Sequence, residues 1–365
     1  MRILYDSTLF LHRNVGGFTR YFTELANGLF ASKQNAATNV LVFAGLNCAH
    51  VTRSDFAAGV YQGVSLPSFR GSWRIYKALN DLGMQALLSF SDGASTVLHE
   101  TYYGAPQLWN PRVKRVITIH DMIWEEEEFT GSDTWSIRAK RASALRADGI
   151  LFVSQSTRLA YRRHFPQRCP EAVVHHGCEL RTTRAPQPVD SPWPYILFVG
   201  RRGGYKNWSR MVQAIGLAKL WKTHGLINVG GALSESELQE LRTAGIPADR
   251  VRTLRCDDDV LSDLYRGAEC FVFPSMAEGF GIPLLEAARC GSPIACSDIP
   301  VFREILPAGP NFFDPHSPAA MMASIQECLH AGRGSRKVAE AEQAAQTYSW
   351  QRTADETLGF YRSLF

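Results

Sequence analysis

The 365-residue chain lacks several features that would each point to a particular class of protein. No stretch approaches the roughly 18 uninterrupted apolar residues of a membrane-spanning helix. Residues 1–6 become polar too early for the apolar region of a signal peptide. Internal repeats and low-complexity segments are also missing. We therefore expect a cytoplasmic, globular protein without a membrane span.

The cysteines form no recognisable framework. All eight are scattered, and no CxxC pair occurs, which favours free thiols in a reducing compartment. Cys169 and Cys178 bracket His175 and His176, but this spacing fits no common zinc site. Residues 172–174, between them, are typical of a strand. We predict no bound metal.

A strong excess of charge of one sign is absent as well. The net charge of +4 is too balanced for a protein that coats nucleic acid, so we expect no nucleic-acid partner. Residues 1–185 hold 21 basic and 15 acidic side chains, whereas residues 186–365 hold 18 and 20. The first half is therefore +6 and the second −2. A hydrophobic fraction of 45% is enough for sizeable cores.

Short apolar runs alternate with longer helical patterns, which is typical of parallel α/β structure. Predicted strands cover residues 2–5, 40–44, 96–99, 115–119, 149–153, 172–175, 195–199, 227–229, 251–254, 270–273, 293–296 and 311–313. Predicted helices include 18–30, 234–244, 260–268 and 283–290. Residues 182–194 contain four prolines and suit an extended linker. Two α/β domains joined by this linker imply a cleft between them.

The densest chemical signal is a strand, a glycine loop and a helix start within residues 273–291. We expect the helix to begin near Ile282 or Pro283, because proline suits a first helical turn. Backbone amides there, with the unhindered backbone of Gly279 and Gly281, make a site for phosphate. An ordinary strand–loop–helix joint explains the same pattern, so the residues alone leave both interpretations open.

Glu278 and Glu286 flank this loop and its helix start. Carboxylates do not bind an anion, but they accept hydrogen bonds from sugar hydroxyls. The pair therefore suits sugar hydroxyls beside the phosphate. The alternative is that Glu278 only caps the helix.

This stretch resembles the E-G-F-G-x-P-x-x-E-A signature of the family 4 glycosyltransferases, which are retaining enzymes of GT-B fold. Glu278 and Glu286 have its E-x7-E spacing. Further segments resemble family motifs in the expected order: residues 14–20 with Gly16 and Gly17, His120 and Asp121, residues 174–177, residues 198–207 with Arg201 and Lys206, and residues 348–350. The resemblance covers essentially the whole chain.

The resemblance implies a fold of two Rossmann-like parallel-sheet domains that face a central cleft. Residues 1–185 would form the acceptor-binding domain and residues 195–345 the nucleotide-sugar-binding domain, with 186–194 as the linker. Residues 346–365 would form a helix that packs back on the first domain.

The resemblance also assigns roles to individual residues. It places His120 against the donor sugar, Arg201 and Lys206 on the diphosphate, and Glu278 on the hydroxyls of the transferred sugar. The remaining donor contacts would come from Gly16, Gly17, Gly279, Phe280, Gly281 and, on the nucleotide ribose, Glu286. Two cations after a strand end can offset the charge of a departing diphosphate. From the residues alone, solvated cations, a simple turn at the two glycines and a structural His120 stay open.

The resemblance implies a metal-independent hexosyltransferase that acts with retention and needs no cofactor. Its donor would be a nucleotide diphosphate sugar, with GDP-mannose favoured. Its acceptor would be a hydroxyl of a glycan or lipid-linked intermediate in surface polysaccharide or O-antigen synthesis. No carboxylate presents itself as a covalent nucleophile, and the resemblance implies front-side substitution assisted by the diphosphate. Two alternatives are a GT-B sugar-nucleotide epimerase or hydrolase and a non-catalytic sugar-nucleotide-binding protein.

Other acidic and glycine-rich patterns are interpreted as structural. Residues 279–284 lack the third glycine of the dinucleotide-binding fingerprint, and no P-loop motif occurs. Residues 257–259, three aspartates that formally contain a D-x-D motif, precede a helical run and suit its cap and first turn. Residues 125–128, all glutamate, are expected to form a solvated acidic loop, with an acceptor-side role left open by the proximity of His120.

The basic residues of the first half form two clusters. One cluster comprises Arg138, Lys140, Arg141 and Arg146, and the other comprises Arg158, Arg162, Arg163, His164 and Arg168. Arg158 and Arg162 are one helical turn apart and share a face. Two interpretations stay open: a solvated surface, and peripheral contact with the anionic inner face of a membrane, which would suit a lipid-linked acceptor.

Overall fold

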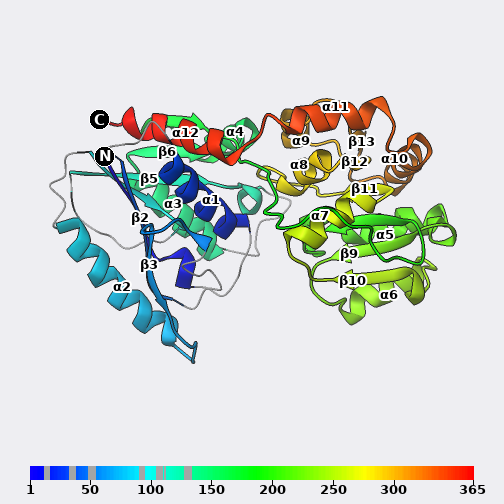
Figure 1. The fold of residues 1–365 in the computed structure, drawn as a ribbon, viewed down its shortest axis with the longest axis horizontal. Coiled ribbons are helices and arrows are strands. Elements are labelled where there is room, and N and C mark those ends of the chain that lie inside the picture. The colour runs from blue at the N-terminus through cyan, green and yellow to red at the C-terminus, as the bar shows by residue number, and fades with distance from the viewer. Residues whose placement is uncertain are drawn as a thin grey trace. The chain divides into compact units, whose positions relative to one another are not determined.

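The computed structural model describes residues 1–11, 17–32, 38–47, 55–89, 95–103, 110, 112–126 and 134–365. The chain forms two compact units (Figure 1). Unit 1 comprises Met1–Gly177 and Ser349–Phe365, and unit 2 comprises Cys178–Tyr348. Each unit contains one parallel sheet with helices packed on it, which confirms the predicted α/β class.

Unit 1 has a seven-stranded sheet of order β3-β2-β1-β4-β5-β6-β7, and every neighbouring pair is parallel. The strands are β1 (Arg2–Tyr5), β2 (Asn39–Asn47), β3 (Tyr61–Ser65), β4 (Thr96–Glu100), β5 (Val113–Ile119), β6 (Gly149–Phe152) and β7 (Glu171–Val173). The helices are α1 (Gly17–Ala31), α2 (Ser72–Ser89), α3 (Thr134–Arg146), α4 (Gln155–His164) and α12 (Trp350–Arg362), with 3₁₀ turns at Leu9–Leu11 and Ile123–Glu125. The central strands β1 and β4 are almost entirely buried, as expected for a parallel sheet covered on both faces.

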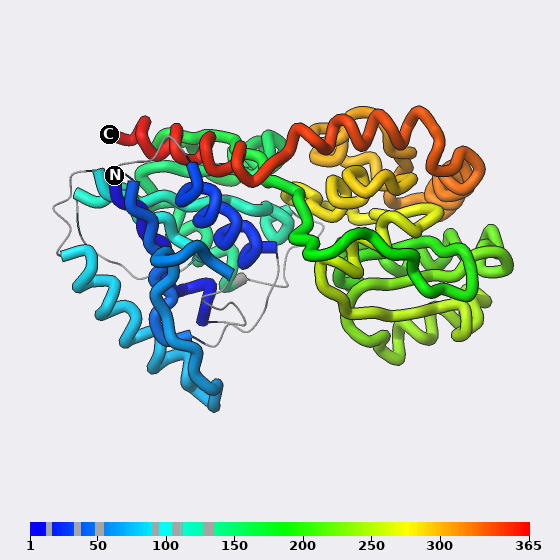
Figure 2. Tube along the Cα trace, viewed as in Figure 1, coloured from blue at the N-terminus to red at the C-terminus, as the bar shows by residue number. Residues whose placement is uncertain are grey.

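The C-terminal helix α12 belongs to unit 1, where it lies beside α1 (Figure 2). Gly28 of α1 permits the close approach, because a Cβ atom there would lie 2.8 Å from the Cβ of Ala354. The chain therefore leaves unit 1 after Gly177 and returns to it at Ser349.

Unit 2 has a six-stranded parallel sheet of order β10-β9-β8-β11-β12-β13. The strands are β8 (Tyr195–Val199), β9 (Gly225–Val229), β10 (Val251–Leu254), β11 (Cys270–Phe273), β12 (Ile294–Ser297) and β13 (Asn311–Phe313). The helices are α5 (Trp208–Leu217), α6 (Glu235–Thr243), α7 (Asp258–Gly267), α8 (Ile282–Arg289), α9 (Pro300–Ile305), α10 (Pro318–Ala331) and α11 (Arg336–Ala345), with 3₁₀ turns at Gly204–Lys206, Leu220–Lys222 and Ala248–Arg250. A core that includes Phe198, Trp208 and Val272 fills the space between the sheet and its helices.

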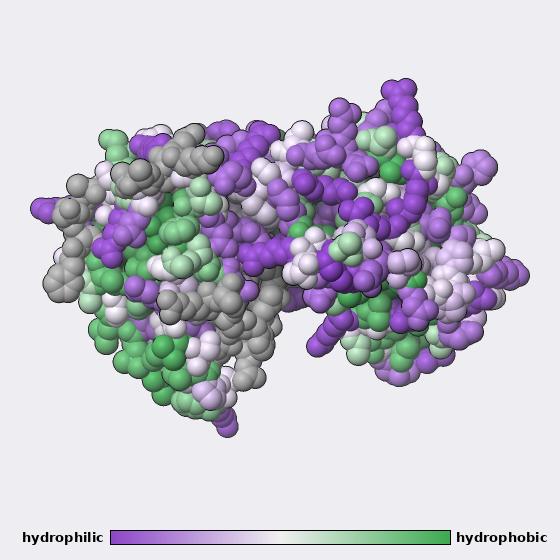
Figure 3. Space-filling model, in the orientation of Figure 1, coloured by the Kyte–Doolittle hydropathy of each residue, from purple (hydrophilic) through white to green (hydrophobic). Residues whose placement is uncertain are grey.

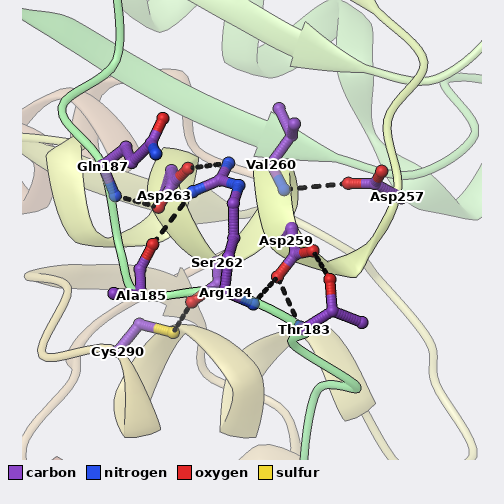
Figure 4. A network of polar contacts seen from close by, with 10 residues as sticks. All are labelled: Thr183, Arg184, Ala185, Gln187, Asp257, Asp259, Val260, Ser262, Asp263 and Cys290. Atoms are coloured by element: carbon purple, nitrogen blue, oxygen red, sulfur yellow. Dashed lines mark hydrogen bonds and ion pairs between the residues drawn. The ribbon is translucent and has the colours of Figure 1, made fainter.

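The boundary between the two units does not fall in the proline-rich segment, where the sequence predicted it. The boundary between the units falls after Gly177, and residues 178–194 belong to unit 2. The reason is a set of hydrogen bonds to α7 (Figure 4): Thr183 donates to Asp259, with its backbone N 2.8 Å from Oδ1, and the Arg184 guanidinium lies 2.6 Å from Asp263. The aspartates of α7 thus fasten the start of the predicted linker to unit 2.

The three consecutive aspartates include the predicted helix cap. Asp257 is the N-cap of α7, and its Oδ1 accepts a hydrogen bond from the backbone N of Val260 at 3.0 Å. Asp258 and Asp259 have an additional role that the sequence did not indicate, since Asp258 Oδ2 lies 2.8 Å from the backbone N of Arg181. These carboxylates hold the preceding chain segment.

Within the part of the chain that the structure describes, no helix is both long enough and apolar enough to cross a membrane.

Candidate functional site

The sheet of unit 2 has a point where its strand order reverses. The first strand, β8, lies between β9 and β11, so the chain continues to one side through β9 and β10 and to the other from β11 onward. In open α/β sheets, ligands bind beyond the carboxyl ends of the strands at this point. Two loops leave from there, residues 200–207 after β8 and residues 274–281 after β11.

The two loops are fastened to one another. The backbone N of Met276 donates to the carbonyl of Tyr205 at 2.7 Å. The buried Asn207 side chain donates to the carbonyls of Pro274 and Pro315 at 3.0 and 2.8 Å. Asn207 also adopts a left-handed backbone conformation with φ of 61°, which asparagine tolerates better than most residues. Asn207 therefore braces the site, a role that its place in the motif did not reveal.

Lys206 and Glu278, one from each loop, form an ion pair with 2.5 Å between Nζ and Oε1. Both side chains are mostly buried, at 17% and 11% exposure. The Lys206 ammonium also lies over the rings of Phe273 and Tyr205, at 5.5 and 5.2 Å from their centroids. The structure thus brings together two predicted site residues that lie 72 positions apart.

Arg201 lies in the same loop as Lys206, but its side chain is exposed and makes no ion pair with any described residue. An unpaired cation beside a paired one gives the loop a net positive charge that an incoming anion can neutralise.

The loop after β11 ends at Gly281, the N-cap of α8. Its φ of +107° favours glycine, and a Cβ atom there would lie 2.9 Å from the ring of Phe302. The helix begins at Ile282 with a proline in its first turn, as predicted, and no side chain of the described residues caps it. Gly279 precedes this turn, and the Phe280 side chain is buried. The uncapped helix start suits an anionic ligand.

Glu286 lies one turn inside α8 and is buried, with 4% exposure. Its Oε2 accepts a hydrogen bond at 3.2 Å from the hydroxyl of Tyr265, which is fully buried. The hydrogen bond fixes the carboxylate beside the helix start. No pattern in the sequence pointed to Tyr265, because it reads only as an apolar residue of α7.

In unit 1, His120 follows β5 and lies among aromatic rings. Its ring centroid is 4.3 Å from that of Phe18, 4.9 Å from that of Tyr21 and 5.6 Å from that of His176, which it stacks on. Burial is the largest cause that lowers the pKa of His120 well below its usual value, and electrostatic interactions with His176, His99 and Lys140 lower the pKa further. The imidazole is therefore neutral at pH 7, and its Nε2 has no hydrogen-bond partner among the described residues.

The surroundings of Lys140 contradict two predictions from the sequence, one for its basic cluster and one for the acidic loop. It is 2% exposed and lies in neither a solvated nor a membrane-facing cluster. Its Nζ is 2.9 Å from Glu125 Oε2 and 2.8 Å from the carbonyl of Asp121. Glu125 is buried too, so the prediction of a solvated loop is wrong for this residue. A buried cation requires such partners, because an unpaired charge is strongly disfavoured inside a protein.

Several other arginines of the two basic clusters are neutralised by acids. Glu171 accepts from Arg158 at 3.2 Å and from Arg162 at 2.9 Å. Arg163 pairs with Glu126. These ion pairs reduce the positive charge that the basic clusters could present to an anionic membrane.

The structure describes only part of the predicted glycine pair and of the acidic run. Gly17 is the exposed first residue of α1, whereas Gly16, Glu127 and Glu128 lie outside the described residues. His176 packs between Tyr21 and Trp350, at 4.8 and 5.8 Å between ring centroids. Among the described residues, no group of three or more His, Cys, Asp or Glu side chains is placed to hold a metal ion.

Comparison with known proteins places this geometry in a family. Residues 181–346 match the family described as glycosyl transferases group 1. Over its whole length the chain superimposes on sucrose-phosphate synthase from Thermosynechococcus elongatus, covering 100% of this chain and 99% of that one, with a TM-score of 0.78 and 18% identity. The two parallel-sheet units therefore define a GT-B glycosyltransferase fold.

Two relatives extend the match. The chain is 33% identical to the O-antigen chain mannosyltransferase RfbU of Salmonella typhimurium over 260 residues, which cover 70% of this chain and 69% of the relative. It is 32% identical to O-antigen chain mannosyltransferase B of Escherichia coli over 176 residues, which cover 47% of this chain and 46%, less than half, of that protein. The chain belongs to the group 1 glycosyltransferases.

Proposed function

We propose that the protein transfers a hexose from a nucleotide diphosphate sugar to a hydroxyl of a glycan or lipid-linked acceptor, with retention of configuration and without a metal ion. GDP-mannose is the favoured donor, since both relatives described above are O-antigen mannosyltransferases. The acceptor would then be an intermediate of a surface polysaccharide. An epimerase or hydrolase would leave the acceptor unused, which the experiment below tests.

The ion pair between Lys206 and Glu278 is the observation that carries this proposal. A cation and a carboxylate 2.5 Å apart at one sheet edge match the two ends of a sugar phosphate. Lys206 binds the phosphate oxygens, and Glu278 accepts hydrogen bonds from the sugar hydroxyls. Binding of the donor thus exchanges the internal ion pair for two contacts to one ligand.

The neighbouring groups complete the donor site. Arg201 and the uncapped start of α8 add positive potential where charge accumulates on the departing diphosphate. Glu286, held by Tyr265, accepts hydrogen bonds from the ribose. For His120 we propose, on the family resemblance alone, a polar contact between its neutral imidazole and the donor sugar.

Replacement of Lys206 tests the assignment. We expect Lys206→Ala to lower donor turnover by about 10²–10³-fold, the usual cost of losing a group that stabilises developing negative charge. The matched control is Lys222→Ala, which removes an exposed lysine of the same unit. Both variants are checked for folding by circular dichroism, and release of the nucleotide diphosphate is measured with GDP-, UDP-, dTDP- and CMP-sugars. A folded Lys206→Ala protein with wild-type turnover contradicts the proposal.

The same assay separates the competing activities. Transfer requires that donor consumption depend on added acceptor, and the anomeric configuration of the product, read by NMR, reports retention. Consumption of the donor alone, with free sugar or an epimer as product, indicates a hydrolase or epimerase. Activity that survives EDTA supports independence from metal.

A further inference from the structure

The buried side chain of Asn207 joins three loops of unit 2. Asn207 ends the loop after β8 and is the N-cap of α5, and it is 4% exposed. Its Nδ2 donates to the carbonyl of Pro274, after β11, at 3.0 Å and to the carbonyl of Pro315, after β13, at 2.8 Å. Both N–H bonds of the amide are therefore engaged. The loops that follow three different strands meet at this one side chain.

Arg210 lies on the oxygen side of the same amide. Its Nη1 donates to Asn207 Oδ1 at 3.0 Å and lies 3.3 Å from Met276 Sδ. Arg210 and Asn207 are three positions apart at the start of α5, a spacing that places two side chains on one face of a helix. A guanidinium only donates and a backbone carbonyl only accepts, so the amide satisfies its three partners in a single orientation. Arg210 therefore determines which way the Asn207 amide faces.

The alternative interpretation of Arg210 is an ordinary surface arginine. Figure 3 shows many hydrophilic residues, drawn in purple, on the visible face of unit 2, which occupies the right-hand part of Figure 1. An arginine in such a surface usually contacts water or a carboxylate. Arg210, in contrast, pairs with no carboxylate of the described residues, and its hydrogen-bond partners there are Asn207 and Met276. These partners belong to the two loops that carry Lys206 and Glu278.

We propose that Arg210 is a positioning residue for the Lys206–Glu278 ion pair. No hydrogen bond or ion pair joins Arg210 to either of these two side chains, all of which the structure describes. Arg210 instead acts through Asn207, which directly follows Lys206, and through Met276, two residues before Glu278.

The physical reason is the burial of the Asn207 amide. Without Arg210, Oδ1 loses its donor, and a buried oxygen without a partner is strongly disfavoured. The amide then turns toward another donor or toward water, its hold on the carbonyls of Pro274 and Pro315 weakens, and the two loops separate. The effect on the ion pair does not depend on the reaction, whereas the expected effect on turnover rests on the proposed function.

The reactivity of the Lys206 amine tests this role without a substrate. An N-hydroxysuccinimide ester of acetic acid acylates lysines, and mass spectrometry gives the rate at each position. We expect Arg210→Met to raise the acylation rate of Lys206 about three- to tenfold, because local opening of the loops releases the amine from its ion pair. Lys222, an exposed lysine of the same unit, is the internal reference. The matched control is Arg242→Met, which removes an exposed arginine paired with Glu235 at 2.6 Å on α6.

A second variant shows whether Arg210 acts through the amide. Asn207→Gly removes the amide but tolerates the left-handed backbone at this position. In the Asn207→Gly protein, the further change Arg210→Met should alter the acylation rate of Lys206 by less than about twofold, because the two residues act as a unit. Arg210→Lys, which keeps a charged donor, should lie closer to the wild type than Arg210→Met does. Turnover should fall about tenfold in Arg210→Met.

Each outcome bears on the proposal. A folded Arg210→Met protein that acylates Lys206 at the wild-type rate overturns it. A further large increase when Arg210→Met is added to Asn207→Gly also overturns it, because Arg210 would then act without the amide. Arg210→Ala provides the same comparison if Arg210→Met does not fold. If Arg210→Met frees Lys206 but the wild type turns over no donor, the positioning role is supported and the proposed function fails.

Discussion

Units 1 and 2 have the same strand order around their first strand, but the described residues at the corresponding sheet edge differ in their chemistry. In both sheets the first strand is central, the second and third lie to one side and the fourth lies to the other. Among the residues of unit 1 that the structure describes directly after β1 and β4, Asp6 and Thr101 are buried and hydrogen-bonded to one another, whereas in unit 2 the loops carry Arg201 and the Lys206–Glu278 pair. Topology therefore decides where a site can form, and the residues decide whether that edge receives an anion.

Two buried polar side chains of unit 1, Asp6 and His99, are held by internal hydrogen bonds. Asp6, after β1, accepts from the backbone N of Thr8 at 2.8 Å and from the Thr101 hydroxyl at 2.7 Å, and burial raises its pKa. His99 of β4 lies 2.5 Å from the Tyr361 hydroxyl, and burial lowers its pKa to about 3. Such groups give up interaction with solvent for fixed positions, which suits a rigid support better than a site for a charged ligand.

The largest expected difference between the units is their response to acid. The pKa values of His99 and His176 are about 3, and that of His120 is also well below normal, so the folded protein keeps all three neutral as pH falls. The unfolded chain binds these protons below about pH 6.5, so each histidine lowers the unfolding free energy by about 1.4 kcal/mol per pH unit between pH 6.5 and its folded pKa.

Substitution isolates this contribution from that of other buried groups. His99→Gln should flatten the dependence of the unfolding free energy on pH between 6.5 and 5 by about 1.4 kcal/mol per unit, measured by urea denaturation. The control is His164→Gln, a change at an exposed histidine of the same unit. An equal slope for the wild type and His99→Gln would mean that His99 is not held neutral.

A smaller effect is expected from neutralising Glu278 in unit 2. Glu278→Gln releases Lys206 from its ion pair, so the lysine becomes fully available to phosphate. We expect about tenfold tighter binding of GDP by calorimetry, while transfer slows because the sugar loses its carboxylate contact. Glu327→Gln is the control, because it removes a pair of 2.6 Å to Lys337 elsewhere in unit 2. Unchanged GDP affinity in Glu278→Gln would show that the pair does not compete with phosphate.

The smallest effect concerns the segment that α7 holds. Asp259→Ala removes the acceptor of the Thr183 N–H and hydroxyl. Trypsin should then cleave near Arg181 and Arg184 about two- to fivefold faster, because local opening exposes the segment without unfolding unit 2. Asp249→Ala, at an exposed aspartate of the same unit, should leave the cleavage rate unchanged. Equal cleavage rates in the two variants would mean that Asp259 does not hold this segment against unit 2.

Much of the sheet structure was predictable because buried parallel strands are continuous apolar runs. The predictions for β8, β10, β11 and β13 agree with the structure at both ends. Strand β3 was missed, since only Tyr61 of its five residues is buried and Gly63 interrupts it. Helix α2 was missed for a different reason. Its apolar residues lie on both faces, so no single helical period stands out.

The site was predictable in its residue types and motif spacing but not in its pairings. The sequence indicated cations after β8 and carboxylates after β11, yet contact between Lys206 and Glu278 depends on two adjacent strands that are far apart in the chain. Polarity misled the prediction for Lys140 and Glu125, which are buried together. From the sequence alone, a charged residue is predicted to be exposed unless its ion-pair partner is known. Only the fold shows which residue that partner is.

The two units differ in the path of the chain: unit 1 consists of two separate segments of the chain, whereas unit 2 consists of one. The points where the chain leaves unit 1 and returns to it lie close together, since a Cβ atom on Gly177 would lie 2.3 Å from the backbone N of Trp350. Unit 2 begins and ends at one place as well, with Cys178 Sγ 3.5 Å from the carbonyl of Tyr348. Unit 2 is therefore an insert in unit 1, and a short peptide joining Gly177 directly to Ser349 would restore an unbroken single-sheet domain. Because the proposed donor site lies in unit 2, we expect that exchanging this insert for another would change the donor and leave unit 1 as it is.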